Sequence, residues 1–385
     1  MRFGRMRDSS AHKNIAHGES CERNAMTDKI DLKDYGYAGD AGQADGLVPA
    51  RVVGQHRDRY RIVCAFGEGE AVLKGSFIYG ARFREDLPCV GDFVMLRPGE
   101  PALVERLLPR RTKFSRADFF GHALAHIRAN NEQVVAANFD YVFVMSSLNR
   151  DFNVNRIVRY LTQAWQSGAK PVVVLTKADL VADAGAQLAE VRAAAAGVPV
   201  HAVSGLSGLA LESLDEYLRP GKTAVFLGMS GVGKSSLVNA LAGAEVAAVR
   251  EIREDDARGR HTTTARQLLM LPSGAMVVDT PGMRELGIFR AGQGISGNFA
   301  EVEALFSRCR FGDCRHGNEP GCAVAAALEN GELSRETWNR YLAHVRENAY
   351  FDDRKAYMTE RAARNRSLNR KNRRDKRGGE FGDLE

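Results

Sequence analysis

Apolar and polar positions follow different patterns in different parts of the chain, and the first pattern predicts a small β-barrel. Between residues 47 and 108, short apolar stretches recur at intervals of roughly ten residues, separated by turn-forming residues. The predicted strands are 47–53, 60–66, 70–74, 92–96 and 102–107. A barrel of this size fits an OB-fold, a frequent binder of single-stranded nucleic acid. A barrel that only packs on its neighbour would show the same pattern.

A second pattern follows from residue 111 to about residue 288. Continuous apolar runs rich in β-branched residues alternate with segments whose apolar positions recur at helical spacing. Such runs predict buried strands of a parallel sheet, and the segments between them predict its covering helices. The predicted strands are 141–146, 171–175, 200–203, 224–227 and 276–278, and the helices are 154–166, 186–196 and 234–241. Beyond residue 288 only helices are predicted, at 301–307, 322–329 and 335–358.

One of the strand-to-helix turns carries a phosphate-binding motif. Residues 228–235 read GMSGVGKS, which matches G-x-x-x-x-G-K-[ST] in full. Backbone N–H groups of such a loop wrap the phosphates, Lys234 reaches the β- and γ-phosphates, and Ser235 ligates Mg²⁺. The residues expected to hold the nucleotide here are Gly228, Met229, Ser230, Gly231, Val232, Gly233, Lys234, Ser235 and Ser236.

The base motif follows the predicted strand 171–175 and reads Thr176, Lys177, Ala178, Asp179. A carboxylate only accepts hydrogen bonds, and guanine offers two adjacent donors, at N1–H and N2–H₂. Adenine would place a lone pair against the same carboxylate. The motif therefore predicts guanine specificity, with the Lys177 stem over the purine ring. Ser204 follows the next short strand, in the segment where GTPases place a backbone N–H against the guanine O6.

A fourth motif follows strand 276–278, where Asp279 and Gly282 form D-x-x-G. In this position the aspartate holds Mg²⁺ through water and the glycine N–H contacts the γ-phosphate. The motif order is unusual, because the base motif precedes the phosphate loop. The same sheet can form if the ordinary termini are joined near 215–223 and new ones open after the switch region. A switch movement would then pull directly on the C-terminal domain.

The residue that activates water is not evident. The position that carries a catalytic glutamine in Ras-like enzymes is Met283, so a slow intrinsic GTPase is expected. Residues 258–264 occupy the place of switch I, where we expect Thr263 to complete the Mg²⁺ shell. His261 is the best candidate to position water, although a contact to a neighbour or to rRNA would explain it equally well.

Three cysteines and a histidine form a cluster with metal-ligand spacing: Cys309, Cys314, His316 and Cys322. Three thiolates and one imidazole make a complete tetrahedral set for structural Zn²⁺, with no open position for catalysis. The alternative is buried or redox-active cysteines. Asp313 is a candidate acceptor beside the ligands.

Charge adds an anionic partner to this picture. The net charge is +6, and nearly every second residue of 361–377 is Arg or Lys, which predicts a disordered basic tail of the kind that docks on RNA phosphates. We find neither a membrane-length apolar run nor a signal-peptide core, and expect a cytoplasmic, monomeric protein without a membrane partner. Residues 1–25 predict a disordered extension, unless translation starts at Met26.

The motif order, the residues TKAD, GMSGVGKS and DTPG, and the cysteine cluster resemble the bacterial RsgA family of small ribosomal subunit biogenesis GTPases over about 47–350. The resemblance implies an OB-fold, a circularly permuted GTPase domain and a zinc domain. It also implies GTP hydrolysis coupled to late 30S maturation, contact with 16S rRNA, and stimulation by the subunit. Two rivals remain open: a metabolic P-loop enzyme such as a nucleotide kinase, and a zinc-dependent RNA binder that holds nucleotide only as a ligand.

The predicted fold class is therefore a multidomain α/β protein with an OB-fold barrel, a permuted P-loop GTPase domain and a helical zinc domain. The expected segments are an extension and linker at 1–46, the barrel at 47–110, the GTPase domain at 111–288, the zinc domain at 289–358 and the basic tail at 359–385.

Overall fold

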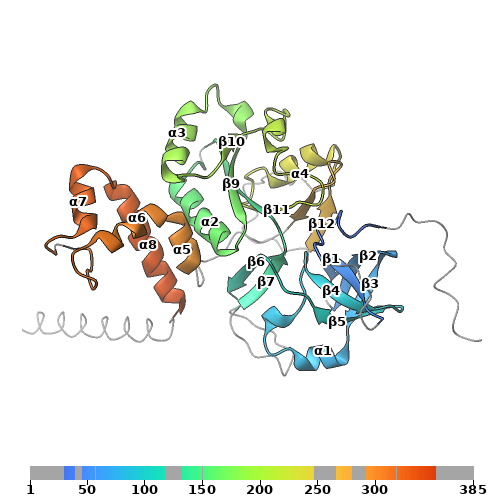
Figure 1. Cartoon of the computed structure of the whole chain (residues 1–385). Coiled ribbons are helices and arrows are strands. Elements are labelled where there is room, and N and C mark those ends of the chain that lie inside the picture. The colour runs from blue at the N-terminus through green and yellow to red at the C-terminus, as the bar shows by residue number, and fades with distance from the viewer. Residues whose placement is uncertain are drawn as a thin grey trace, which may run out of the picture.

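The computed structural model describes residues 30–39, 46–56, 58–117, 132–149, 151–246, 266–279, 292–317 and 319–352. Three bodies are evident in Figure 1: a barrel, a central α/β domain and a group of C-terminal helices. The N-terminal extension, Met26 and the basic tail lie outside the described residues. Within the described part, no helix is long and apolar enough to cross a membrane.

The barrel forms as the strand pattern predicted. Its strands are β1 (Val48–His56), β2 (Arg59–Cys64), β3 (Gly67–Leu73), β4 (Phe93–Arg97) and β5 (Ala102–Leu107), with α1 (Gly75–Gly80) after β3. Strand β1 pairs with β2 and β4, β2 with β3, and β3 runs parallel to β5, which pairs with β4. This closed five-stranded order is that of an OB-fold barrel. Alternate side chains, among them Val52, Ile62 and Val94, fill its core.

The central sheet has the order β10-β9-β8-β11-β13-β12. Its strands are β8 (Tyr141–Ser147), β9 (Lys170–Thr176), β10 (Val200–Ala202), β11 (Thr223–Leu227), β12 (Arg266–Met270) and β13 (Met276–Asp279). All but β12 run parallel, as predicted. Helices α2 (Val154–Gln166), α3 (Gly185–Ala194) and α4 (Lys234–Ala242) follow β8, β9 and β11. Strands β8, β9 and β10 precede β11 in the chain. Residues 203–222 therefore connect β10 to β11, which is the permuted connection.

Three strands were not predicted. Strand β12 is antiparallel and only partly buried, so no continuous buried run marks it. Strands β6 (Lys113–Ala117) and β7 (Glu132–Ala137) form a separate antiparallel pair. Residues 118–131 separate the two strands. Pairing between segments that are distant in the chain leaves little signal in the local sequence.

The sheet continues across the expected domain boundary, because β12 pairs with β1 of the barrel. The joint contains a buried arginine, Arg51 of β1. Its guanidinium donates to the carbonyls of Tyr35 and Asn138 and to Thr223 Oγ1, the last at 3.0 Å. Burial lowers the pKa of Arg51 to about 9. Residues 30–39, inside the span predicted as a linker, thus pack on this joint, where Leu32 is also buried.

A buried ion pair joins the residue before β4 to the segment after β5. Arg110 donates to both carboxylate oxygens of Asp92 at 2.8 and 2.7 Å, and the two side chains are 12% and 0% exposed. We expect Asp92→Ala to destabilise the chain by about 3–5 kcal/mol, because it leaves the Arg110 charge buried without its counterion. The matched control is Arg59→Ala, which removes the exposed pair with Glu70 and should cost under about 1 kcal/mol. Urea unfolding measures both, and equal losses would contradict the assignment.

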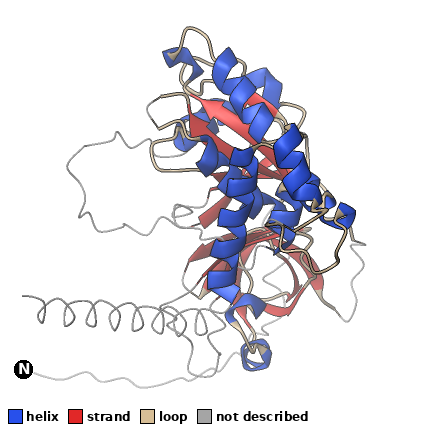
Figure 2. Cartoon of the chain, turned by 90° about the vertical axis from the view of Figure 1, so that its left-hand side faces the viewer, coloured by secondary structure: helices blue, strands red, loops and turns tan. Residues whose placement is uncertain are grey.

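The C-terminal helices dock on α2. They are α5 (Gly292–Asn298), α6 (Ala300–Ala304), α7 (Ala323–Asn330) and α8 (Arg335–Asp352). A Cβ at Gly294 would lie 2.0 Å from the Thr162 carbonyl oxygen, so glycine allows α5 its close approach to α2. The Asn298 amide donates to the Val158 carbonyl at 3.1 Å, and Arg159 pairs with Glu347 of α8. In the view of Figure 2, the central strands lie behind the helices, and the barrel lies below them.

Candidate functional site

The carboxyl ends of the parallel strands bring the separate sequence motifs to one edge of the central sheet. Strand β9 ends at Thr176 and leads into the base motif, whereas β11 ends at Leu227 and leads into the phosphate loop. The Thr176 hydroxyl donates to the Val232 carbonyl of the phosphate loop and so joins the two motifs directly. This edge is where open α/β sheets bind their ligands.

The phosphate loop adopts a conformation that depends on its glycines. Gly231 and Gly233 have φ of +70° and +100°, which side chains rarely tolerate. A Cβ at Gly228 would lie 2.9 Å from the Met145 carbonyl oxygen on β8. The Lys234 ammonium lies inside the loop and donates to the carbonyls of Gly228 and Met229 at 2.7 and 2.9 Å. Helix α4 begins at Lys234, so its N-terminal N–H groups face the same space.

The base motif forms a tight turn beside this loop. Lys177 has a left-handed conformation with φ of +61°, and Asp179 lies exposed in the short 3₁₀ turn Ala178–Leu180. The Ala178 N–H donates to the Val203 carbonyl at 3.1 Å, which ties the base motif to the segment after β10. There the buried Ser204 hydroxyl accepts from two backbone N–H groups of its own turn and holds that turn in shape.

Gly205, which follows Ser204, makes a close contact that the sequence pattern did not reveal. A Cβ at this position would lie 2.8 Å from the Leu237 backbone N of α4. The segment after β10 therefore rests directly on the helix that follows the phosphate loop. A glycine next to Ser204 is visible in the sequence, but its contact with α4 depends on the packing of two elements distant in the chain.

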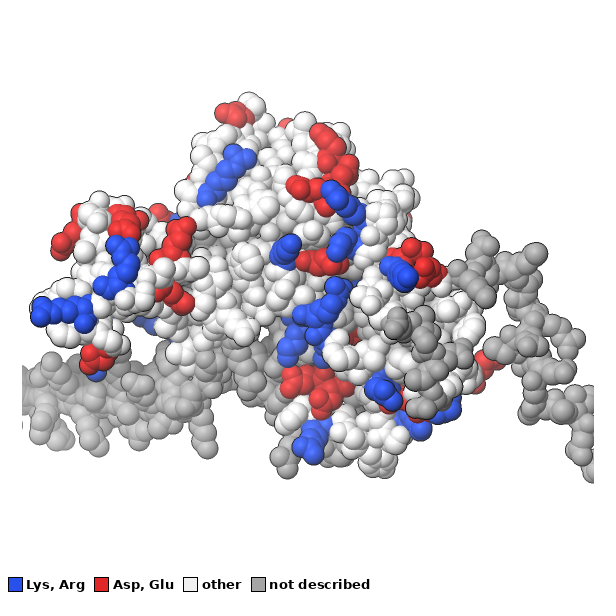
Figure 3. Space-filling view, viewed as in Figure 1, with Lys and Arg blue, Asp and Glu red and all other residues white. Residues whose placement is uncertain are grey.

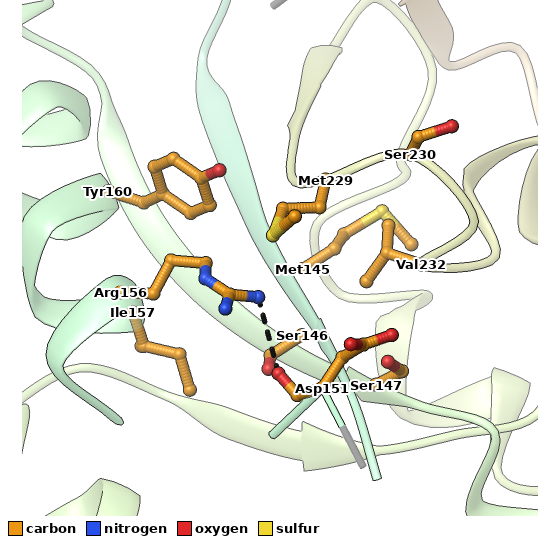
Figure 4. Close-up of a pocket in the computed structure, with 10 residues that line it drawn as sticks. All are labelled: Met145, Ser146, Ser147, Asp151, Arg156, Ile157, Tyr160, Met229, Ser230 and Val232. Atoms are coloured by element: carbon orange, nitrogen blue, oxygen red, sulfur yellow. Dashed lines mark hydrogen bonds between the residues drawn. The ribbon is translucent and has the colours of Figure 1, made fainter. Parts of the chain in front are cut away.

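A pocket lies beside the phosphate loop. Figure 4 shows its lining from four places: the end of β8, the segment between β8 and α2, helix α2 and the phosphate loop. Arg156 and Tyr160 of α2 line it opposite Met229 and Ser230, and Arg156 Nη1 donates to the Asp151 carbonyl at 3.3 Å. The α2 residues were not among the expected site residues, because only the fold carries this helix to the loop.

Several expected residues lie outside the described part of the chain: His261, Thr263, Gly282 and Met283. Asp279 is the last residue of β13, and β13 pairs with β11. The backbone of Asp279 therefore lies beside β11, the strand that leads into the phosphate loop. The D-x-x-G motif predicted this position.

The fold also assembles the cysteine cluster. The ligand atoms of Cys309, Cys314, His316 and Cys322 all lie within 4.8 Å of one another. His316 Nδ1 is 3.5 Å from Cys309 Sγ and 3.9 Å from Cys322 Sγ. With Zn–S near 2.3 Å and Zn–N near 2.0–2.1 Å, the corners of a tetrahedral site lie roughly 3.5–3.8 Å apart. The four side chains therefore fit a tetrahedral metal ion.

The surroundings of Cys309 favour its thiolate. Backbone N–H groups of Ala323 and Ala325 donate to Cys309 and Cys322 at 3.4 Å each. Burial opposes ionisation of Cys309, but the backbone N–H groups of Ala323 and Val324 and the neighbouring thiols hold the pKa of Cys309 below its ordinary value. The His316 ring stacks on Phe306 with centroids 4.1 Å apart, which fixes its orientation.

Comparisons with known proteins agree with this geometry. A family model described as RsgA GTPase matches residues 108–289. The small ribosomal subunit biogenesis GTPase RsgA 2 of Lactiplantibacillus plantarum is 43% identical over 327 residues, which cover 83% of this chain and 90% of that protein. The chain belongs to the RsgA family of GTPases. RsgA 2 of Listeria monocytogenes is 45% identical over 300 residues, covering 78% of this chain and 83% of that protein.

The fold of this chain is also similar to that of solved structures. The crystal structure of YjeQ from Thermotoga maritima aligns with a TM-score of 0.57 and 28% identity, covering 77% of this chain and 96% of that one. YloQ, a circularly permuted GTPase, aligns with a TM-score of 0.56 and 23% identity, covering 81% and 97%. The predicted family and fold class are confirmed. This RsgA-family chain is a GTPase, which sets aside both the metabolic P-loop enzyme and the purely ligand-binding protein.

Proposed function

We propose that the chain couples GTP hydrolysis to late maturation of the 30S ribosomal subunit, binds 16S rRNA and is stimulated by the subunit. The names of the RsgA relatives support a role in small-subunit biogenesis. The hydrogen bond between Thr176 and Val232 carries the proposal, because it joins the base motif to the phosphate loop in one site. We further infer a monomeric, cytoplasmic protein.

In this site each motif has a separate task. Asp179 accepts the two guanine donors, and Ser204 shapes the turn that faces the guanine O6. Lys234 turns its ammonium from the loop carbonyls to the β- and γ-phosphates, where the charge of the transition state gathers. Ser235, Thr263 and Asp279 would hold Mg²⁺, which would neutralise charge on the phosphates, and the Gly282 N–H would contact the γ-phosphate.

We propose a structural role for the cysteine cluster. All four positions of a tetrahedral Zn²⁺ are supplied by Cys309, Cys314, His316 and Cys322, so none remains for substrate. Zinc bound there stabilises the segment between α6 and α7, which has no regular element of its own beyond one 3₁₀ turn.

Phosphate release from GTP, measured with and without purified 30S subunits, tests the proposal. We expect slow turnover alone, because Met283 cannot orient water, and a rise of at least about tenfold with subunits. 50S subunits serve as the control. Turnover that 30S subunits leave unchanged would overturn the proposed coupling.

Substitution of His261 tests the assigned catalytic residue. We expect His261→Ala to abolish subunit-stimulated hydrolysis, with a loss of about 10²–10⁴-fold, while GTP affinity is unchanged. Single-turnover hydrolysis and nucleotide titration separate the two effects. His201→Ala is a matched control, since His201 belongs to none of the motifs, lies on β10 and contacts the Tyr217 hydroxyl at 3.0 Å. Retained stimulation in His261→Ala would exclude this histidine.

A further inference from the structure

One exposed aromatic ring on the cysteine cluster has no use in the site described above. Phe311, between Cys309 and Cys314, is 45% exposed. The rings of Phe299, Phe306, Trp338 and Tyr341 in the same domain pack against one another. Exposing so much of a phenylalanine ring to water costs free energy, and this ring does not pack among the other aromatic rings of the domain.

The loop that carries Phe311 is held at several points. The Arg310 N–H donates to the Gly321 carbonyl at 3.1 Å, and the Cys314 N–H donates to the Phe311 carbonyl at 3.3 Å. A Cβ at Gly321 would lie 2.9 Å from Arg310 Cβ, so the arginine side chain starts directly over this glycine. On the other side, a Cβ at Gly312 would meet no atom within 4 Å. The ring therefore stands on a constrained loop with open space beside it.

Charge around the ring indicates the chemistry of its partner. The Arg310 guanidinium carbon lies 5.5 Å from the centre of the Phe311 ring. Residues 308–316 contain three arginines and one aspartate, and of these arginines Arg308 pairs with Glu332 at 2.9 Å. Arg310 and Arg315 are exposed. Basic side chains on this outer end of the molecule are visible in Figure 3.

We propose that Phe311 and Arg310 form a stacking platform for an unpaired RNA base, with Arg315 beside the neighbouring phosphate. A planar ring with a guanidinium accepts any base, since each base has a π-face. An apolar protein partner would fit less well, because Phe311 is flanked by Arg310 and Gly312 rather than by further apolar side chains. This inference rests on the proposed binding of 16S rRNA and assigns it a contact.

The test compares the zinc-loaded full chain with Phe311→Ala and Phe311→Trp in equilibrium binding to 30S subunits and to protein-free 16S rRNA at several KCl concentrations. We expect Phe311→Ala to weaken binding to both targets by roughly 10- to 100-fold, and Phe311→Trp to restore it. Because no charge is removed, the slope of log affinity against log salt stays unchanged. Arg315→Gln, which removes the charge beside the phosphate, should lower that slope by about one.

Val345→Ala is the matched control, as it removes an exposed apolar side chain (38% exposed) from α8 of the same domain. All variants should keep their zinc content and basal GTP hydrolysis. Wild-type binding by Phe311→Ala would overturn the platform alone. A loss confined to 30S subunits, with rRNA binding intact, would assign Phe311 to a ribosomal protein instead. A wild-type chain that binds neither target would overturn the proposed function and this inference with it.

Discussion

Asp179→Asn should change the nucleotide that the protein accepts. In the proposed site the Asp179 carboxylate accepts from the N1–H and N2–H₂ donors of guanine, whereas an asparagine amide offers one acceptor and one donor. The donor would face the guanine amine, so GTP affinity should fall by about 10⁴-fold. Xanthosine triphosphate carries a carbonyl oxygen in place of that amine and should bind the variant better than GTP.

Competition binding with the two nucleotides measures the exchange. Asp183→Asn is the matched control, because Asp183 is also exposed, lies four residues further along and accepts from the Gly185 N–H at 2.8 Å. It should leave the preference for GTP unaltered. Undiminished GTP affinity in Asp179→Asn would show that another group reads the base.

Removal of zinc should unfold the C-terminal domain. Structural Zn²⁺ contributes about 10–16 kcal/mol of apparent binding free energy, which becomes folding free energy when the ligands are brought together only by the fold. The four ligands Cys309, Cys314, His316 and Cys322 all lie within the segment 305–322. Cys314→Ala should therefore abolish zinc retention, and the region from 305 to 352 should become sensitive to protease.

The same variant should still bind GTP, because the phosphate loop and base motif lie on the central sheet. Metal analysis, limited proteolysis and nucleotide titration measure the three properties. Cys64→Ala, which changes a cysteine of the barrel, is the control for thiol loss and should keep its zinc. A protease-resistant C-terminal domain in zinc-free Cys314→Ala would refute the structural role.

Local sequence was sufficient for most elements of the fold. The buried runs that became β8, β9 and β11 were evident because apolar residues are continuous there. Helix α2 has the expected bounds, since its apolar positions recur at helical spacing and Asn153 caps it by accepting from the Arg156 N–H. The four cysteine-cluster ligands were likewise found from spacing alone, because they lie close together in the chain.

What the sequence by itself determined is the set of motifs: the phosphate loop, the base motif with Asp179, the permuted order and the four candidate metal ligands. Each depends on residue type and short spacing, which the chain displays directly. The tertiary structure decided where these parts meet. It joined β1 to β12 in one sheet, carried α2 to the phosphate loop, set Gly205 against α4 and left Phe311 exposed beside Arg310. These features depend on contacts between residues far apart in the chain, and no local pattern encodes such contacts.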